Sequence, residues 1–141
     1  MKSKILLMDD DPAVRRMLSR VLEDEAYTVF GATNASEALE VASTRDVDLA
    51  MVDLNLPDET GWDLFERLIR EHPLLPIVVV TARANQLFPA LAAGVGALME
   101  KPLDLPRLLS TIRDLLKEPA EARRARLGGQ PAQFHYLPAR G

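Results

Sequence analysis

Residues 49–53 read Leu-Ala-Met-Val-Asp, a short apolar run that ends in an aspartate, and this pattern decides the fold class. Three other short apolar runs lead into a polar or charged side chain in the same way. They are residues 5–8 before Asp9 and Asp10, residues 77–80 before Thr81, and residues 97–99 before Lys101. Such runs are typical of strands buried on both faces of a parallel sheet, whose carboxyl ends share one edge where ligands bind. We therefore expect the four ends to face one another.

The segments between the apolar runs carry the helical period. After Asp11-Pro12, the apolar residues expected on one helix face are Val14, Met17, Leu18, Val21 and Leu22, with Arg15, Arg16, Arg20 and Glu23 outside that stripe. Further helices are expected at about 36–43, from Trp62 and Phe65 to a stop at His72-Pro73, and at about 104–117. A second strand is expected at 28–30. Together these repeats predict an α/β fold, a doubly wound five-stranded parallel sheet with five helices on its two faces, joined by right-handed crossovers.

Composition excludes several classes of protein. The chain has no cysteine, which rules out disulfides and thiolate metal ligands. No apolar run approaches the roughly 20 residues that cross a bilayer, so we expect no membrane association and a cytoplasmic location. Residues 1–118 hold 13 Lys/Arg against 20 Asp/Glu, a net charge of −7. This acidic body argues against a nucleic-acid-binding face, which needs clustered positive charge.

The last 23 residues differ from the rest of the chain. Residues 119–141 contain three prolines, three glycines and four arginines against one glutamate, and they show no apolar period. We therefore expect one domain at 1–118 and a basic tail at 119–141. The alternatives for the tail are a disordered end or docking through Phe134, Tyr136 and Leu137, either on the same molecule or on a second copy in a homodimer.

The convergent side chains predict a magnesium site. Asp9, Asp10 and Asp53 would repel one another at one sheet edge unless a cation neutralises them. Oxygen-only ligands at an open site suit Mg²⁺. We expect Mg²⁺ to be held by Asp9 or Asp10, by one oxygen of Asp53 and by a backbone carbonyl near Asn55. The other oxygen of Asp53 can then attack phosphorus as a nucleophile.

The other two strand ends supply what a phosphoryl group needs. Its transfer leaves negative charge on three equatorial oxygens, which the protein must neutralise. The Lys101 ammonium would contact one of these oxygens, and the Thr81 hydroxyl with nearby backbone N–H groups another. Asp53, Thr81 and Lys101 are therefore the predicted catalytic residues.

Taken together, these motifs resemble the receiver domain of bacterial two-component response regulators, and in outline the stand-alone chemotaxis receiver. The matching segments span residues 4–117 in order and spacing. They are the acidic pair in Leu7-Met8-Asp9-Asp10-Asp11-Pro12, the phosphoacceptor loop Asp53-Leu54-Asn55-Leu56-Pro57 with Gly61, the switch hydroxyl in Val80-Thr81-Ala82, and Lys101-Pro102. The resemblance implies a flavodoxin-like sheet of strand order 2-1-3-4-5 and a cis candidate at Lys101-Pro102.

The resemblance also implies the function. Asp53 would receive phosphate from a histidine kinase or a histidine phosphotransfer protein, in a Mg²⁺-dependent reaction that the receiver itself catalyses, as it catalyses its own dephosphorylation. Such a domain turns over no external metabolite and is not an enzyme in the ordinary sense. The sequence has no recognisable DNA-binding output domain. The phosphorylated form would then act by switching contacts with a downstream protein or by onward phosphotransfer, or else the chain is a fragment of a longer protein.

Two departures fall on the part of the family that transmits the signal. Leu98 stands where most receivers carry Tyr or Phe, three residues before the lysine. The stretch from Thr81 to Gly94 is about two residues shorter than usual and contains Pro89, which predicts a short or displaced fourth helix.

Two other functions stay open on the sequence. A pseudo-receiver would use the same fold as a docking scaffold, and Leu98 is the feature in its favour. A haloacid-dehalogenase-like phosphatase would use Asp9 and Asp11 as an Asp-x-Asp pair, but it needs a second acidic pair after the lysine. Asp10 and Asp11 before Pro12 also have a simpler role available, as caps of the first helix.

Overall fold

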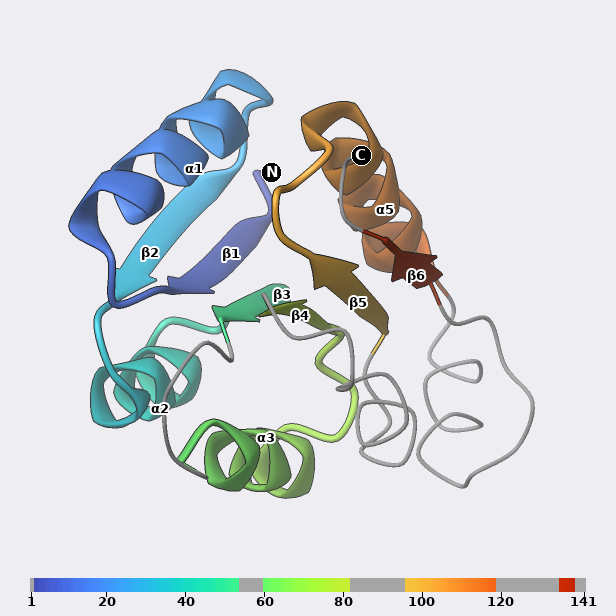
Figure 1. Ribbon diagram of the computed structural model, residues 1–141. Helices are drawn as coiled ribbons and strands as arrows, with labels where there is room; N and C mark the ends of the chain where they lie inside the picture. The colour runs from blue at the N-terminus through green and yellow to red at the C-terminus, as the bar shows by residue number, and fades with distance from the viewer. Residues whose placement is uncertain (1, 54–59, 82–95, 119–134, 139–141) are drawn as a thin grey trace.

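A computed structural model of the chain describes residues 2–53, 60–81, 96–118 and 135–138. These residues form one parallel sheet with helices on both faces (Figure 1). The strands are β1 (Lys4–Met8), β2 (Thr28–Ala32), β3 (Leu49–Asp53), β4 (Ile77–Thr81), β5 (Ala97–Glu100) and β6 (His135–Leu137). The helices are α1 (Pro12–Asp24), α2 (Ala35–Thr44), α3 (Thr60–Glu71) and α5 (Leu105–Lys117).

The sheet has the order β2-β1-β3-β4-β5-β6, and every neighbouring pair is parallel. The first five strands confirm the predicted order 2-1-3-4-5. The sixth strand was not expected: three residues of the tail pair with β5, Ala97 with His135, Leu98 with Tyr136 and Met99 with Leu137. The outer edge of β5 is therefore covered by backbone from the C-terminal part of the chain.

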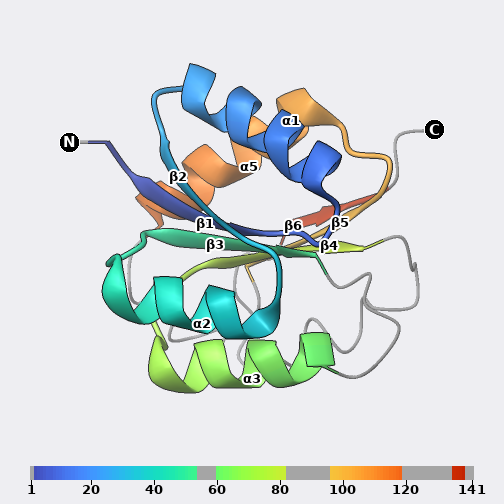
Figure 2. The ribbon, with the colours of Figure 1, turned by 90° about the vertical axis from the view of Figure 1, so that its left-hand side faces the viewer.

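The helices form two layers (Figure 2). Helices α1 and α5 lie on one face of the sheet, and α2 and α3 lie on the other. Successive side chains of a strand point to opposite faces. In β1, Leu6 and Met8 accordingly pack in the α2/α3 layer, whereas Ile5 and Leu7 pack in the α1/α5 layer.

The helices begin where the sequence supplies caps. Asp11 and Asp104 cap α1 and α5, and Asn34 caps α2, each with a side-chain oxygen that accepts a backbone N–H of the first turn. The role of Asp11 as a cap, one of the two readings of the acidic run, is confirmed. The Lys101–Pro102 peptide bond is cis, as the resemblance implied.

Helix α1 departs from the predicted stripe at one position. Leu18 and Leu22 are buried and Val14 packs partly against the core, but Met17 is 45% exposed. Each residue turns a helix by about 100°, so Met17 lies about 100° around α1 from the buried Leu18. This places Met17 at the rim of the buried face. Including Met17 in the buried face was therefore wrong.

Some expectations lie outside the described residues. The fourth helix with Pro89, the Asn55 carbonyl and the side chains of Trp62 and Phe65 belong to this group. The same holds for tail residues 119–134. Among the helices of the described part, none combines the length and apolar character needed to cross a membrane.

Candidate functional site

The sheet brings the four predicted strand ends to one edge. Met8 of β1 pairs with Val52 of β3, so Asp9 follows β1 at the level where Asp53 ends β3. Thr81 ends β4, opposite Glu100 at the end of β5, and Lys101 follows directly. Residues from four separate segments thus share a single edge, as predicted.

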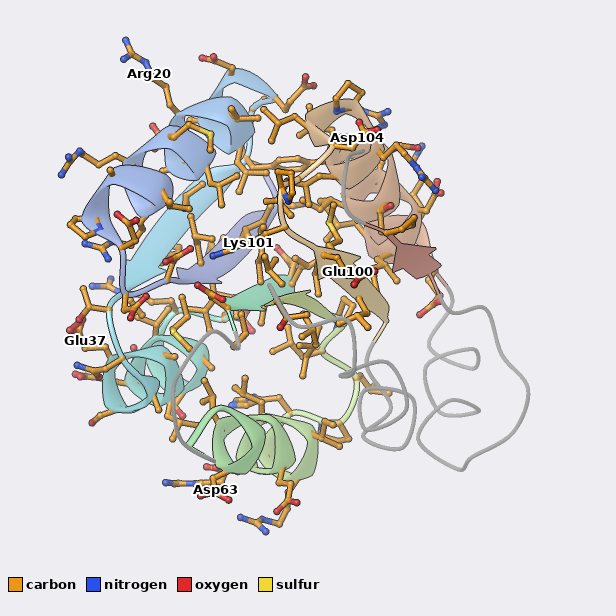
Figure 3. The ribbon with its side chains drawn as sticks, viewed as in Figure 1. Arg20, Glu37, Asp63, Glu100, Lys101 and Asp104 are labelled. Atoms are coloured by element: carbon orange, nitrogen blue, oxygen red, sulfur yellow. The ribbon has the colours of Figure 1, made fainter. Side chains whose placement is uncertain are left out.

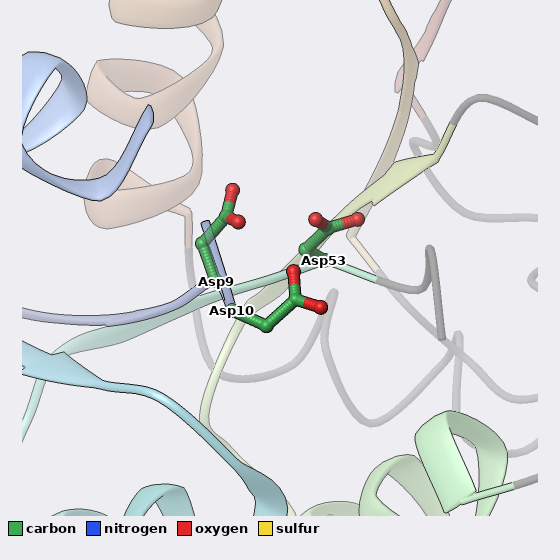
Figure 4. A group of neighbouring side chains, drawn as sticks. All are labelled: Asp9, Asp10 and Asp53. Atoms are coloured by element: carbon green, nitrogen blue, oxygen red, sulfur yellow. The ribbon is translucent and has the colours of Figure 1, made fainter. Parts of the chain in front are cut away.

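Three carboxylates gather at this edge (Figure 4). Asp9 and Asp10 lie in the turn between β1 and α1, and they face Asp53 at the end of β3. One carboxylate oxygen of each residue lies within 4.8 Å of the others. Asp9 and Asp53 are buried, whereas Asp10 is exposed. The arrangement suits Mg²⁺, because hard carboxylate oxygens at a partly open position leave room for the waters and phosphate oxygens that Mg²⁺ prefers.

Lys101 places a positive charge inside this acidic cluster. The Lys101 Nζ lies 3.0 Å from Asp53 Oδ2, in an ion pair whose side chains are 25% and 5% exposed. Figure 3 shows Lys101 reaching from the end of β5 across the ends of the neighbouring strands. Its backbone N–H donates to the carbonyl oxygen of Thr81 at 2.8 Å, which fixes the start of the side chain. Asp53 is therefore held by a cation that can also reach a group bound to it.

Crowding changes the acidity of the buried member of the acidic pair. The pKa of Asp9 is raised above 3.8, first because burial removes water from its carboxylate, and further because Asp53 and Asp10 are negative. The hydrogen bond from the Asp11 backbone and the charge of Lys101 oppose this shift. The surroundings of Asp9 therefore disfavour its charged form.

The turn that carries the acidic pair is fixed by backbone contacts. The Asp9 N–H donates to the Ala32 carbonyl at 3.1 Å, and the Asp11 N–H donates to Asp9 Oδ1 at 2.9 Å. The side chain of Asp11 turns away to cap α1, accepting the N–H groups of Ala13 and Val14. Asp11 is thereby engaged outside the acidic cluster, which counts against an Asp9/Asp11 pair of the phosphatase type.

Sequence reasoning missed one residue that contacts this turn. Arg15, assigned to the polar side of α1, donates from Nη1 to the carbonyl oxygen of Asp9 at 2.6 Å. The sequence gives one signal for this contact, the glycine at position 31 in β2, over which the Arg15 side chain passes. A glycine in a strand can mark such a close approach.

A separate cleft lies at the opposite end of the sheet. Its volume is about 510 Å³, and it is lined by the end of α2 and by residues that precede β3 and β4. They include Asp46, Asp48 and His72, with His72 at the end of α3 as expected. None of the predicted site residues lines this cleft, so its position does not support a role in the phosphoryl chemistry.

Comparison with known proteins gives a consistent picture. The family model described as the response regulator receiver domain matches residues 5–113. The Escherichia coli K12 transcriptional regulatory protein GlrR is 32% identical over 120 residues, 84% of this chain and 27% of GlrR. The Staphylococcus aureus transcriptional regulatory protein KdpE is 36% identical over 115 residues, 80% of this chain and 49% of KdpE. The chain thus spans between a quarter and a half of these relatives.

Solved structures agree with this match over almost their full length. A CheY-like receiver domain protein from Methanospirillum hungatei JF-1 superposes with a TM-score of 0.79 at 32% identity, covering 86% of this chain and 98% of that one. The non-phosphorylated HemR receiver domain from Leptospira biflexa gives a TM-score of 0.76 at 30% identity, covering 84% and 97%.

Proposed function

Because the chain belongs to the response regulator receiver domain family, we propose that Asp53 is its phosphoacceptor and that phosphorylation switches its contacts with another protein. Receiver domains work in two-component signal transduction and are phosphorylated by histidine kinases or phosphotransfer proteins. The observation that carries the proposal for Asp53 is its ion pair with Lys101, formed at 3.0 Å in the middle of the acidic cluster. A buried carboxylate held this way has a defined position from which to attack.

The proposed reaction moves one phosphoryl group between two proteins. A carboxylate oxygen of Asp53 attacks the phosphorus of a phosphohistidine, and a P–O bond forms as the P–N bond breaks. The imidazole keeps the electron pair of the broken bond and takes up a proton. Lys101 neutralises charge on a phosphoryl oxygen, and the Thr81 hydroxyl donates to another.

The residues around Asp53 would also hold the metal ion. Asp9, Asp10 and Asp53 would bind Mg²⁺ together with the backbone carbonyl of Asn55, which lies outside the described residues. Bound there, Mg²⁺ supplies positive charge to the phosphoryl oxygens during transfer. Asp9 contributes a carboxylate that its own turn already orients, since Oδ1 accepts the Asp11 N–H.

We propose that residues 1–118 form the receiver unit and that its output passes through protein contacts. The net charge of −7 over these residues would repel nucleic-acid phosphates. Residues 119–141 form a tail that contributes β6 to the edge of the sheet.

A scaffold that works without phosphorylation is the second candidate, and Leu98 is the observation in its favour. Leu98 is fully buried in the α2/α3 layer, where it packs as an ordinary core residue of β5. A leucine there has no aromatic ring to move between two positions as the site fills. A scaffold would keep the fold and lose only the response to phosphate.

The test is intact mass spectrometry after incubation with a small acyl phosphate and Mg²⁺. The natural chain, the Asp53→Asn variant and a metal-free sample are compared. We expect one phosphoryl adduct that requires both Asp53 and Mg²⁺. Absence of an adduct in the natural chain would overturn the proposal and favour the scaffold. Turnover of a chromogenic phosphate ester would point instead to a phosphatase.

A further inference from the structure

We propose that Arg15 is a positioning residue for the acidic site, which holds the turn after β1 so that Asp9 and Asp10 meet Asp53 in metal-binding geometry. The inference rests on the proposed function, because it concerns how the same site binds Mg²⁺. It starts from the hydrogen bond of 2.6 Å in which the charged Arg15 Nη1 donates to the Asp9 carbonyl oxygen.

This contact fixes the peptide that joins the two metal-site residues. The carbonyl of Asp9 belongs to the planar peptide unit between Asp9 and Asp10. Holding its oxygen therefore fixes the orientation of the whole unit and the direction in which the chain enters Asp10. Since Asp10 is exposed, little packing around its own side chain would hold it in place.

With Arg15 included, three polar groups of Asp9 have partners among the described residues. Its N–H donates to Ala32 in β2, its Oδ1 accepts from Asp11, and its carbonyl oxygen accepts from Arg15. The first two bonds fix the start of the turn and the Asp9 side chain. Among the contacts of the described residues, the Arg15 bond is the one that holds the peptide leading on to Asp10.

The path of the Arg15 side chain is built into the neighbouring strand. A Cβ atom at Gly31 in β2 would lie 3.3 Å from Arg15 Cδ and 3.7 Å from Nε. The side chain thus crosses β2 where there is no side chain to obstruct it. Leu7 of β1 pairs with Gly31, which places this crossing just before the acidic turn. An alanine at position 31 would push on the side chain without touching the carboxylates.

The charge of Arg15 extends to the next loop along the same edge. It is one of the causes that lower the pKa of Glu37, after the hydrogen bonds from Thr33. The positive charge of Arg15 thus also favours the ionised form of Glu37, in the first turn of α2. Arg16 and Arg20, on the same helix, are exposed and donate no such bond among the described contacts.

The test separates positioning from charge and from general stability. Arg15→Met keeps the length of the side chain and removes its donors, Arg15→Lys keeps the charge, and Arg16→Met is the matched control. Mg²⁺ affinity is measured by isothermal titration calorimetry with the full chain, and stability by thermal unfolding without metal. Gly31→Ala perturbs the same contact from the other side.

We expect Arg15→Met to weaken Mg²⁺ binding about tenfold, as the loss of an outer-shell partner commonly does. Arg15→Lys and Gly31→Ala should lie between this variant and the natural chain. Arg16→Met should bind Mg²⁺ like the natural chain, and once Mg²⁺ saturates Arg15→Met, its phosphorylation rate should approach the natural rate.

Equal affinities for Arg15→Met and Arg16→Met would overturn the inference. So would tighter Mg²⁺ binding by Arg15→Met, because removal of a positive charge alone would have that effect. A loss of metal-free stability with unchanged Mg²⁺ affinity would also overturn it, in favour of a structural role. If the natural chain itself neither binds Mg²⁺ nor accepts phosphate, the proposed function fails instead.

Discussion

Replacing Asp53 by asparagine should stabilise the metal-free protein, although it removes the phosphoacceptor. The carboxylate of Asp53 has oxygens within 4.8 Å of Asp9 and Asp10, and it forms an ion pair of 3.0 Å with Lys101. Asparagine keeps the shape of the side chain and removes its charge. The substitution is stabilising if the repulsion from Asp9 and Asp10 together with the cost of desolvation exceeds the attraction to Lys101.

The Coulomb terms nearly cancel. With an effective dielectric constant of about 20, the 3.0 Å pair with Lys101 contributes about 5 kcal/mol of attraction. At 4.8 Å, buried Asp9 contributes about 3.5 kcal/mol of repulsion, and exposed Asp10 about 1 kcal/mol in a more water-like medium. The remaining term is the cost of removing water from the Asp53 carboxylate, which is only 4% exposed. For a fully buried ion this cost is several kcal/mol.

We therefore expect Asp53→Asn to raise the free energy of unfolding by about 2 kcal/mol, a rise in melting temperature of about 6 °C. Unfolding without Mg²⁺ is followed by circular dichroism. Asp114→Asn, at an exposed position on α5, is the control and should change stability by less than about 0.5 kcal/mol. A variant no more stable than the natural chain would refute the reasoning that these carboxylates repel one another.

Adding Mg²⁺ to the same samples gives a second readout. A ligand that binds only the folded state stabilises it in proportion to the logarithm of its concentration over Kd. The natural chain should gain stability with Mg²⁺, whereas Asp53→Asn should gain much less. The stability advantage of Asp53→Asn over the natural chain should therefore shrink as the Mg²⁺ concentration rises.

Three further predictions follow from the same site and from the sheet edge. Lys101→Met should slow adduct formation from an acyl phosphate by about a hundredfold at saturating Mg²⁺, because one charge-neutralising donor is lost; an unchanged rate would restrict Lys101 to a structural role. Because the pKa of Asp9 is raised, the folded chain binds its proton more tightly than the unfolded chain. The contribution of Asp9 to metal-free stability should therefore rise as the pH falls from neutral through that pKa, and it should be complete below pH 3.8. Denaturant midpoints measured against pH should show this rise in the natural chain and not in Asp9→Asn. A chain ending at Glu118 should keep its circular dichroism spectrum but self-associate more in sedimentation experiments, since β5 loses the strand that covers its edge; an unchanged sedimentation profile would show that β6 does not protect this edge.

The sequence was enough to predict the sheet and the residues gathered at its edge. Side chains carry both signals: apolar runs define the buried strands, and the residue that ends each run marks the shared edge. This reasoning alone places Asp53, Thr81 and Lys101 at the shared edge, because the carboxyl ends of parallel strands lie together whatever the order of the strands in the sheet.

The features that the sequence did not predict depend on backbone groups. Arg15 binds a carbonyl oxygen, and β6 pairs with β5 through N–H and C=O groups. Nearly every residue carries such groups, so the sequence does not name the partner. The helical period could only assign Arg15 to the polar side of α1. Placing β6 would also require knowing the path of residues 119–134, which follow no apolar period.

The alternation along β1 separates the molecule into two cores that share only the sheet. Leu6 and Leu7 are neighbours in the chain, yet they belong to different helical layers. Volume changes in one layer need no matching change in the other, because substitutions without shared contacts act independently. Over evolutionary time the α1/α5 layer and the α2/α3 layer can therefore diverge at separate rates, while the strand ends between them keep the site residues in place.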